Sequence, residues 1–134
     1  VNDRLGHSFG DQAICDTATK LSLVFSEKDF IGRIGGDEFC VFLCLKNSVP
    51  HALSIVEEKA NTLKDILAEY YSNGEETVQV TPSIGISLFP EQAGSYRDLF
   101  KRADIALYHV KNNGKNNFAI YNTSMKNAGE SVYE

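Results

Sequence analysis

Two glycines and two acids, Gly35-Gly36-Asp37-Glu38, lie between two apolar segments of this 134-residue chain. The flanking segments, residues 30–34 and 39–45, are rich in residues that favour β-strands. A Gly-Gly pair in this position predicts a β-hairpin, because glycine readily adopts the positive φ angles that tight hairpin turns need. The second segment shows no polar alternation, which is typical of a strand covered on both faces, so we expect helices to pack on the sheet.

The four residues of the turn have two interpretations. Paired carboxylates at a hairpin tip can bind a divalent metal through their oxygens, and glycines let a ligand approach the backbone closely. A solvated tight turn favours the same residue types. By themselves, these four residues favour a phosphate-handling metal site and a simple turn equally.

Size and composition predict one domain with a substantial core. The chain is 43% hydrophobic and has a formal net charge of -5. An acidic chain is a poor match for a protein that coats nucleic acid, because the phosphates are bound mainly by Lys and Arg. The cysteines Cys15, Cys40 and Cys44 lie in apolar segments, which predicts reduced, buried thiols of a cytoplasmic domain.

Hydrophobic periodicity predicts the other elements of the fold. In chain order we expect a helix over residues 11–27, strands over 30–34 and 39–45, a helix over 50–71, a strand over 78–88, a helix over 95–112 and a strand over 118–121. Tyr70 is expected on the buried face of the second helix, and Ser95 as the N-cap of the third. This order predicts an α/β (α+β) sandwich that resembles a ferredoxin-like palm, with a mixed, mainly antiparallel sheet flanked by helices and without its first strand. Residues 1–122 are expected to form the domain, and residues 123–134 a polar C-terminal tail.

Small residues occupy one face of the strand predicted over residues 78–88. Ser83, Gly85 and Ser87 alternate there with isoleucines and a leucine, and Pro82 predicts an irregularity in the strand. A face of small residues lets a neighbouring element pack closely.

Five short patterns follow one another along the chain. They are Asn2-Asp3 with Gly6-His7 and Gly10-Asp11; Arg33 to Phe39; Thr81 to Gly85; Ala103-Asp104 with Ala106-Leu107-Tyr108; and Lys111 with Gly114-Lys115-Asn116. In this order they resemble the catalytic domain of the diguanylate cyclases, the GGDEF family, over residues 1–121. Each pattern is weak alone, whereas the ordered set is specific.

The resemblance implies a diguanylate cyclase. Such an enzyme is a nucleotidyltransferase that condenses two GTP molecules into cyclic di-GMP plus two pyrophosphates, as a homodimer with one GTP on each subunit. Mg²⁺ or Mn²⁺ is the implied cofactor, because a divalent metal neutralises phosphate charge and helps to activate the attacking hydroxyl. The resemblance also implies fused sensory or regulatory domains in a longer, cytoplasmic parent protein, and whether that protein is tethered to a membrane stays open.

Four residues of the hairpin match the family's catalytic positions. Asp37 resembles the metal ligand and general base, and Glu38 a second carboxylate of the metal site. Gly35 and Gly36 would let the backbone of the turn lie against the phosphates.

The nucleotide-binding positions lie outside the hairpin. Asn2 and Asp11 match the positions that hydrogen-bond guanine, although an acid such as Asp11 also favours the start of a helix. Lys111 and Lys115 match the positions that hold the terminal phosphates. Lys115 replaces the family's usual Arg, so the charge is kept and the bidentate fork is lost.

The chain departs from the family pattern in two places. The family's first strand, with a metal-binding aspartate and a phosphate-binding lysine, is absent before Asn2, so we expect this 134-residue piece by itself to be inactive. The family's Arg-x-x-Asp inhibitory pattern is degenerate, because Asp29 is present and Ser26 stands where the arginine would be. We therefore expect weak or absent product inhibition.

Two other classes of protein remain open. A non-catalytic regulatory module would bind GTP without making product. A ferredoxin-like interaction domain would explain the core, but it would leave the five ordered patterns as coincidence.

Overall fold

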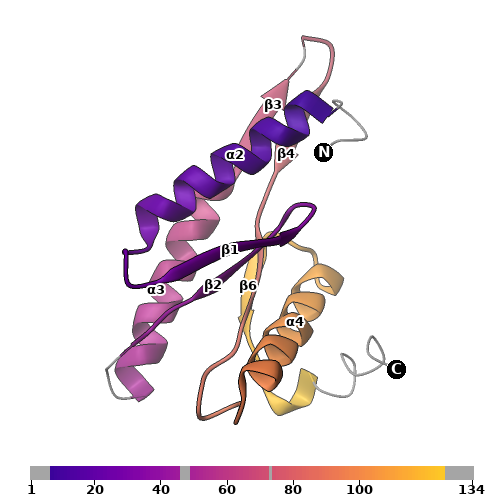
Figure 1. The fold of residues 1–134 in the computed structure, drawn as a ribbon. Coiled ribbons are helices and arrows are strands. Elements are labelled where there is room, and N and C mark those ends of the chain that lie inside the picture. The colour runs from indigo at the N-terminus through magenta and orange to yellow at the C-terminus, as the bar shows by residue number, and fades with distance from the viewer. Residues whose placement is uncertain (1–6, 46–48, 73, 126–134) are drawn as a thin grey trace. The chain divides into compact units, whose positions relative to one another are not determined.

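The computed structural model describes residues 7–45, 49–72 and 74–125, which belong to two compact units, Val1–Val80 and Thr81–Glu134 (Figure 1). The elements of the first unit are α2 (His7–Val24), β1 (Phe30–Gly35), β2 (Glu38–Phe42), α3 (Val49–Leu67), β3 (Glu69–Ser72) and β4 (Thr77–Val80). Those of the second unit are β5 (Ser83–Ile86), α4 (Tyr96–Asn112) and β6 (Asn117–Ile120). The predicted mixture of helices with mainly antiparallel strand pairs is confirmed.

Helices α2 and α3 pack against each other in the first unit. Val56, Ala60 and Leu63 are buried on α3 at the spacing of an amphipathic helix. Lys59, also on α3, donates from Nζ to the carbonyl O of Val24 at 3.2 Å. Val24 ends α2, so this contact satisfies one of the carbonyls that a helix end leaves without an intrahelical partner.

The predicted hairpin is present as β1 and β2. The two strands pair antiparallel from Phe30 opposite Phe42 to Gly35 opposite Glu38, with an irregularity between Arg33 and Gly35. The expectation that the second strand is covered on both faces is wrong, because the side chains of β2 are half-buried and Glu38 is exposed.

Strand β3 replaces the end of the helix that was predicted to continue to residue 71. The helix ends at Leu67, and β3 pairs antiparallel with β4, with Tyr71 opposite Val78 and Ser72 opposite Thr77. Tyr70, predicted on the buried face of the helix, is therefore 66% exposed. The Asn-Gly dipeptide at residues 73–74 is a strong hairpin signal, and Gly74 has a φ of +95°.

The strand predicted over residues 78–88 is divided into β4 and β5. Pro82, which lies between them, has no N–H to donate to a strand partner. The two halves therefore have different partners: β4 pairs with β3, and β5 pairs parallel with β6.

Helix α4 packs on β5 and β6 in the second unit. Ser95 caps α4 as predicted, because its Oγ accepts from the N–H of Asp98 at 3.2 Å. The buried core of this unit contains Ile105 and Ala106 of α4 with Tyr121 and Met125. The core thus reaches three residues into the segment predicted to be a tail.

The predicted close packing over the small-residue face of β5 is confirmed. A Cβ added to Gly85 would overlap the backbone of Ala103 and Leu107 on α4, with the Cα of Leu107 only 2.8 Å away. Ser87 donates from Oγ to the carbonyl O of Leu99 at 2.5 Å. Gly85 is therefore required by the contact with α4.

All three cysteines are free thiols. Cys15 and Cys44 are exposed, so the expectation of buried thiols is wrong for these two. Cys40 is half-buried, and this burial raises the pKa of its thiol. Across residues 7–45, 49–72 and 74–125, no helix has the length and apolar character that a membrane span requires.

Candidate active site

The tip of the β1–β2 hairpin consists of Gly36 and Asp37, between the paired residues Gly35 and Glu38. Gly36 has a φ of +53°, a conformation that glycine adopts at little cost. Arg33 donates from Nε to the carbonyl O of Gly36 at 2.8 Å and so holds the tip from the strand side. Gly35, Gly36, Asp37 and Glu38 are all exposed.

The two glycines of the tip differ in what the protein requires of them. Gly36 needs its positive φ, as a tight turn predicts. Gly35 does not have a positive φ, and a Cβ added there would meet no atom of the described residues within 4 Å. Neither turn conformation nor packing within the described residues therefore requires glycine at position 35.

The carboxylates of Asp37 and Glu38 are adjacent in sequence and face solvent. Carboxylate oxygens suit Mg²⁺ and Mn²⁺, and Mg²⁺ in nucleotide sites is commonly held by one or two carboxylates together with substrate phosphates and water. Among the residues that the structure describes, no three His, Cys, Asp or Glu side chains form a ready metal site. The tip thus fits a metal that arrives with a phosphorylated ligand.

Asp11 does not lie at a helix start. Helix α2 begins at His7, four residues earlier than predicted, and its first turn contains no acid. The interpretation of Asp11 as an acid that stabilises the helix dipole is therefore wrong, because the dipole effect falls off within the first turn. The Asp11 side chain is exposed, and Asn2, its predicted companion in guanine binding, lies outside the described residues.

Lys111 and Lys115 flank the end of α4 in the second unit, and both are exposed. Lys111 is in the last turn of the helix, where a cation is favourable. Three consecutive residues then have positive φ: Gly114 at 98°, Lys115 at 58° and Asn116 at 48°. A lysine held in this conformation is uncommon, and such residues concentrate at functional sites.

Asp29 takes part in the turn between α2 and β1. Its Oδ2 accepts from the backbone N–H of Ser26 at 3.0 Å and from the Ser26 Oγ at 3.2 Å. The aspartate of the predicted inhibitory pattern thus has a local structural partner in the residue that replaces the arginine.

The predicted site residues belong to both compact units. Asp11, Asp37 and Glu38 belong to the first, and the lysines to the second. The hollow of about 410 Å³ that lies in the second unit, beside Arg102 and Tyr121, is lined by none of them. The residues that the structure shows side by side are therefore those of the hairpin tip.

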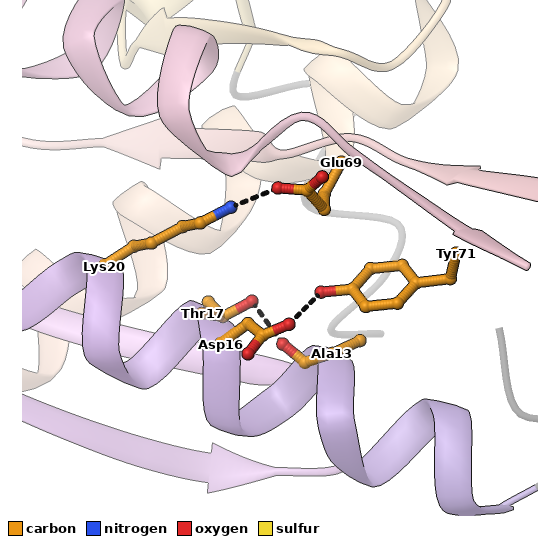
Figure 2. Close-up of polar contacts among 6 residues, drawn as sticks. All are labelled: Ala13, Asp16, Thr17, Lys20, Glu69 and Tyr71. Carbon is orange, nitrogen blue, oxygen red and sulfur yellow. Dashed lines mark hydrogen bonds and ion pairs between the residues drawn. The ribbon is translucent and has the colours of Figure 1, made fainter.

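Two polar contacts between α2 and β3 were not predicted (Figure 2). Tyr71 donates from its hydroxyl to Oδ2 of Asp16 at 2.7 Å, and Lys20 pairs through Nζ with Oε2 of Glu69 at 2.9 Å. Burial and the neighbouring Asp16 carboxylate raise the pKa of Tyr71 above its ordinary value of 10.0. The signal that could have revealed these contacts was the Asn-Gly turn, because it places Tyr71 on a strand.

The family model described as "Diguanylate cyclase, GGDEF domain" matches residues 1–117. This chain belongs to the GGDEF family.

Individual relatives agree in sequence and in structure. The chain is 32% identical to the bifunctional diguanylate cyclase/cyclic di-GMP phosphodiesterase MucR of Pseudomonas aeruginosa, covering 98% of the chain and 19% of MucR. It is 36% identical to the diguanylate cyclase TpbB of the same species, covering 83% of the chain and 25% of TpbB. The solved GGDEF domain of TpbB has a TM-score of 0.77 at 29% identity, covering 99% of this chain and 74% of that structure. The chain thus spans a quarter or less of these two curated relatives.

Proposed function

We propose that this domain is the catalytic part of a diguanylate cyclase, which joins two GTP molecules into cyclic di-GMP. In each half-reaction the 3′-oxygen of one GTP bonds to the α-phosphorus of the other. The bond from that phosphorus to the bridging oxygen breaks, and pyrophosphate leaves. Asp37 accepts the proton of the attacking hydroxyl.

The observation that carries this proposal is Gly35. A simple tight turn explains Gly36 through its positive φ, but it gives no reason for a second glycine at a position with ordinary φ and open space around it. A phosphate group lying against the backbone of the turn supplies that reason, because a Cβ would occupy the space of the ligand. The even choice between turn and ligand site therefore moves toward the ligand site.

The carboxylates of Asp37 and Glu38 would hold Mg²⁺ or Mn²⁺. When bound, such an ion neutralises charge on the phosphates and lowers the pKa of the attacking hydroxyl. Both side chains are exposed, which supports this role because the metal's other oxygens would come from a ligand in the solvent.

Guanine and the terminal phosphates are assigned to residues outside the tip. Asp11 would accept hydrogen bonds from the ring N–H and the amino group of guanine, and its place beyond the first turn of α2 supports a role other than helix capping. Lys111 and Lys115 would bind the terminal phosphates. Asn2, the second candidate for guanine binding, stays a prediction.

One nucleotide per subunit makes the active unit a homodimer, in which the two tips face each other across the substrates. The likeness to MucR, whose name gives it two activities, supports a multidomain protein in which further domains control this one. We place the domain in the cytoplasm, where its substrate GTP is made.

The test is a product assay. The full-length protein is incubated with GTP and Mg²⁺, and nucleotides are separated by chromatography while pyrophosphate is measured enzymatically. We expect cyclic di-GMP and pyrophosphate in a ratio of one to two, with no product when Mg²⁺ is chelated. Tight GTP binding without either product would contradict the proposal and indicate the regulatory GTP-binding module instead.

A further inference from the structure

Helix α2 is joined to β3 at two points one helical turn apart. Asp16 and Lys20 are separated by four residues on α2, and their partners Tyr71 and Glu69 are separated by two residues on β3 (Figure 2). This spacing places each pair on one face of its element. Two contacts at different heights fix both the rotation of α2 about its axis and its translation along β3.

The two contacts differ in strength, because the Tyr71 contact is more buried than the Lys20–Glu69 ion pair. The Tyr71 residue is 8% exposed and packs in a core cluster with Ala13 and Val78. The side chains of Lys20 and Glu69 are 24% and 48% exposed, so solvent screens their ion pair. A buried hydroxyl that donates to a carboxylate is a charge-assisted hydrogen bond, and its loss leaves a polar group in a poorly solvated place. The Tyr71–Asp16 contact is therefore the one that holds α2 in register.

Asp11 lies on the same helix, two residues before Ala13. Asp16 follows Asp11 by five residues, about 7.5 Å along the helix axis at a rise of 1.5 Å per residue. Asp11 is exposed, and among the described residues no side-chain contact anchors it, so α2 sets the point from which its carboxylate extends. A shift of α2 along β3 would move this carboxylate by the same amount.

We propose that Tyr71 and Asp16 form a clasp that positions Asp11 for guanine recognition. This inference rests on the proposed function and adds a specificity role for two residues outside the site. Tyr71 is a positioning residue: it acts on the nucleotide through Asp16 and α2.

The test compares Tyr71→Phe with Tyr70→Phe in the full-length protein. Tyr70 is the neighbouring residue on β3 and is 66% exposed, so the same loss of a hydroxyl there leaves the clasp intact. Binding constants for GTP and for ITP are measured by calorimetry with Ca²⁺ in place of Mg²⁺. ITP lacks the 2-amino group that the Asp11 carboxylate would accept from, so the GTP/ITP affinity ratio reports the placement of that carboxylate.

We expect Tyr71→Phe to lower GTP affinity about tenfold, as for loss of one hydrogen bond to a charged group, and to lower ITP affinity less, because ITP offers Asp11 only the ring N–H. Tyr70→Phe should leave both affinities as in the wild type. Asp16→Ala should reproduce Tyr71→Phe, and Asp16→Asn, which keeps an acceptor oxygen, should restore most of the ratio. These variants keep the test available if one of them folds poorly.

An equal fall in GTP and ITP affinity in Tyr71→Phe would overturn the clasp and leave a contact that only stabilises the fold. An unchanged ratio in a folded variant would overturn it as well. Failure of the Asp11 assignment gives a different result: the wild type itself would bind GTP and ITP equally, and Asp11→Asn would not change that. Failure of the proposed function is distinguished by the product assay, because GTP binding without product, at a normal GTP/ITP ratio, would contradict the cyclase and leave the clasp intact.

Discussion

Gly35 and Gly85 are both glycines of β-strands, and their surroundings are opposite. Around Gly35 the space is open, whereas at Gly85 the backbone of α4 occupies the place of a Cβ. Glycine at an empty position leaves room for something outside the described protein, and glycine at a crowded position lets two elements meet. We propose that Gly35 is kept for function and Gly85 for stability, and each role can be tested by adding one methyl group.

The largest effect is expected at the tip, from Asp37→Asn. We expect cyclase activity of the full-length protein to fall on the order of 10²–10³-fold, as for loss of one group that stabilises charge in a transition state. The melting temperature should stay within about 1 °C, because Asp37 is exposed. Wild-type activity in Asp37→Asn would show that the hairpin tip is not part of the catalytic site.

Gly85→Ala should give the largest loss of stability. The added methyl meets the α4 backbone, which cannot move aside as a side chain can, so we expect the free energy of unfolding to fall by about 3 kcal/mol. Denaturant unfolding followed by circular dichroism measures this change. Gly94→Ala is the matched control, because a Cβ there meets no atom of the described residues within 4 Å, and it should change stability by less than about 0.5 kcal/mol.

Gly35→Ala and Gly36→Ala divide the tip into its two parts. Gly35→Ala should leave stability within about 0.5 kcal/mol and reduce activity about tenfold by raising KM for GTP. Gly36→Ala should cost about 1 kcal/mol of stability, because alanine is unfavourable at a φ of +53°. Wild-type kinetics in Gly35→Ala would show that no ligand occupies the open space beside residue 35. The functional role proposed for Gly35, in contrast to the packing role of Gly85, would then be wrong.

The smallest effect is expected at an exposed contact, the Lys20–Glu69 pair. The Lys20 ammonium holds the pKa of Glu69 below its ordinary value of 4.5. A carboxyl whose pKa is lowered by folding stabilises the folded state above its unfolded pKa, and that contribution is lost as the pH falls through the folded value. Glu69→Gln should therefore lower stability slightly at pH 7 and by less at pH 3, as measured by urea unfolding at both pH values. A difference of equal size at both pH values would show that charge is not the cause.

Much of the fold follows from local patterns in the sequence. The hairpin, the Ser95 cap and the close packing over Gly85 depend on residues near in sequence or on a simple alternation, and all three are confirmed. The prediction that the helix continues to residue 71 was wrong, because Tyr70 and Tyr71 also fit the helical period. Residues 69–72 instead form a strand, because they pair with β4. Such pairing is a contact with another segment, and the helical periodicity of one segment gives no information about it.

The candidate site was less predictable than the fold. The residue types at positions 35–38 indicated metal and phosphate chemistry, but a turn favours the same residues, and the open surroundings of Gly35 that support a ligand site are a property of the folded chain. Whether Asp11 acts only as an acid at a helix start depended on where α2 begins. The helix begins four residues earlier than predicted, which excludes that alternative. Tyr71 and Asp16 are 55 positions apart, so no local pattern could pair them.

The burial of Met125 determines where this domain can be cut. Met125 is 7% exposed and packs with Ile105, Ala106 and Tyr121. A version shortened to residue 122 would keep every strand of the described residues and every predicted site residue, yet it would open an apolar surface on the second unit. A fused tag or reporter should therefore be attached after Met125, and a truncation should leave Met125 in place.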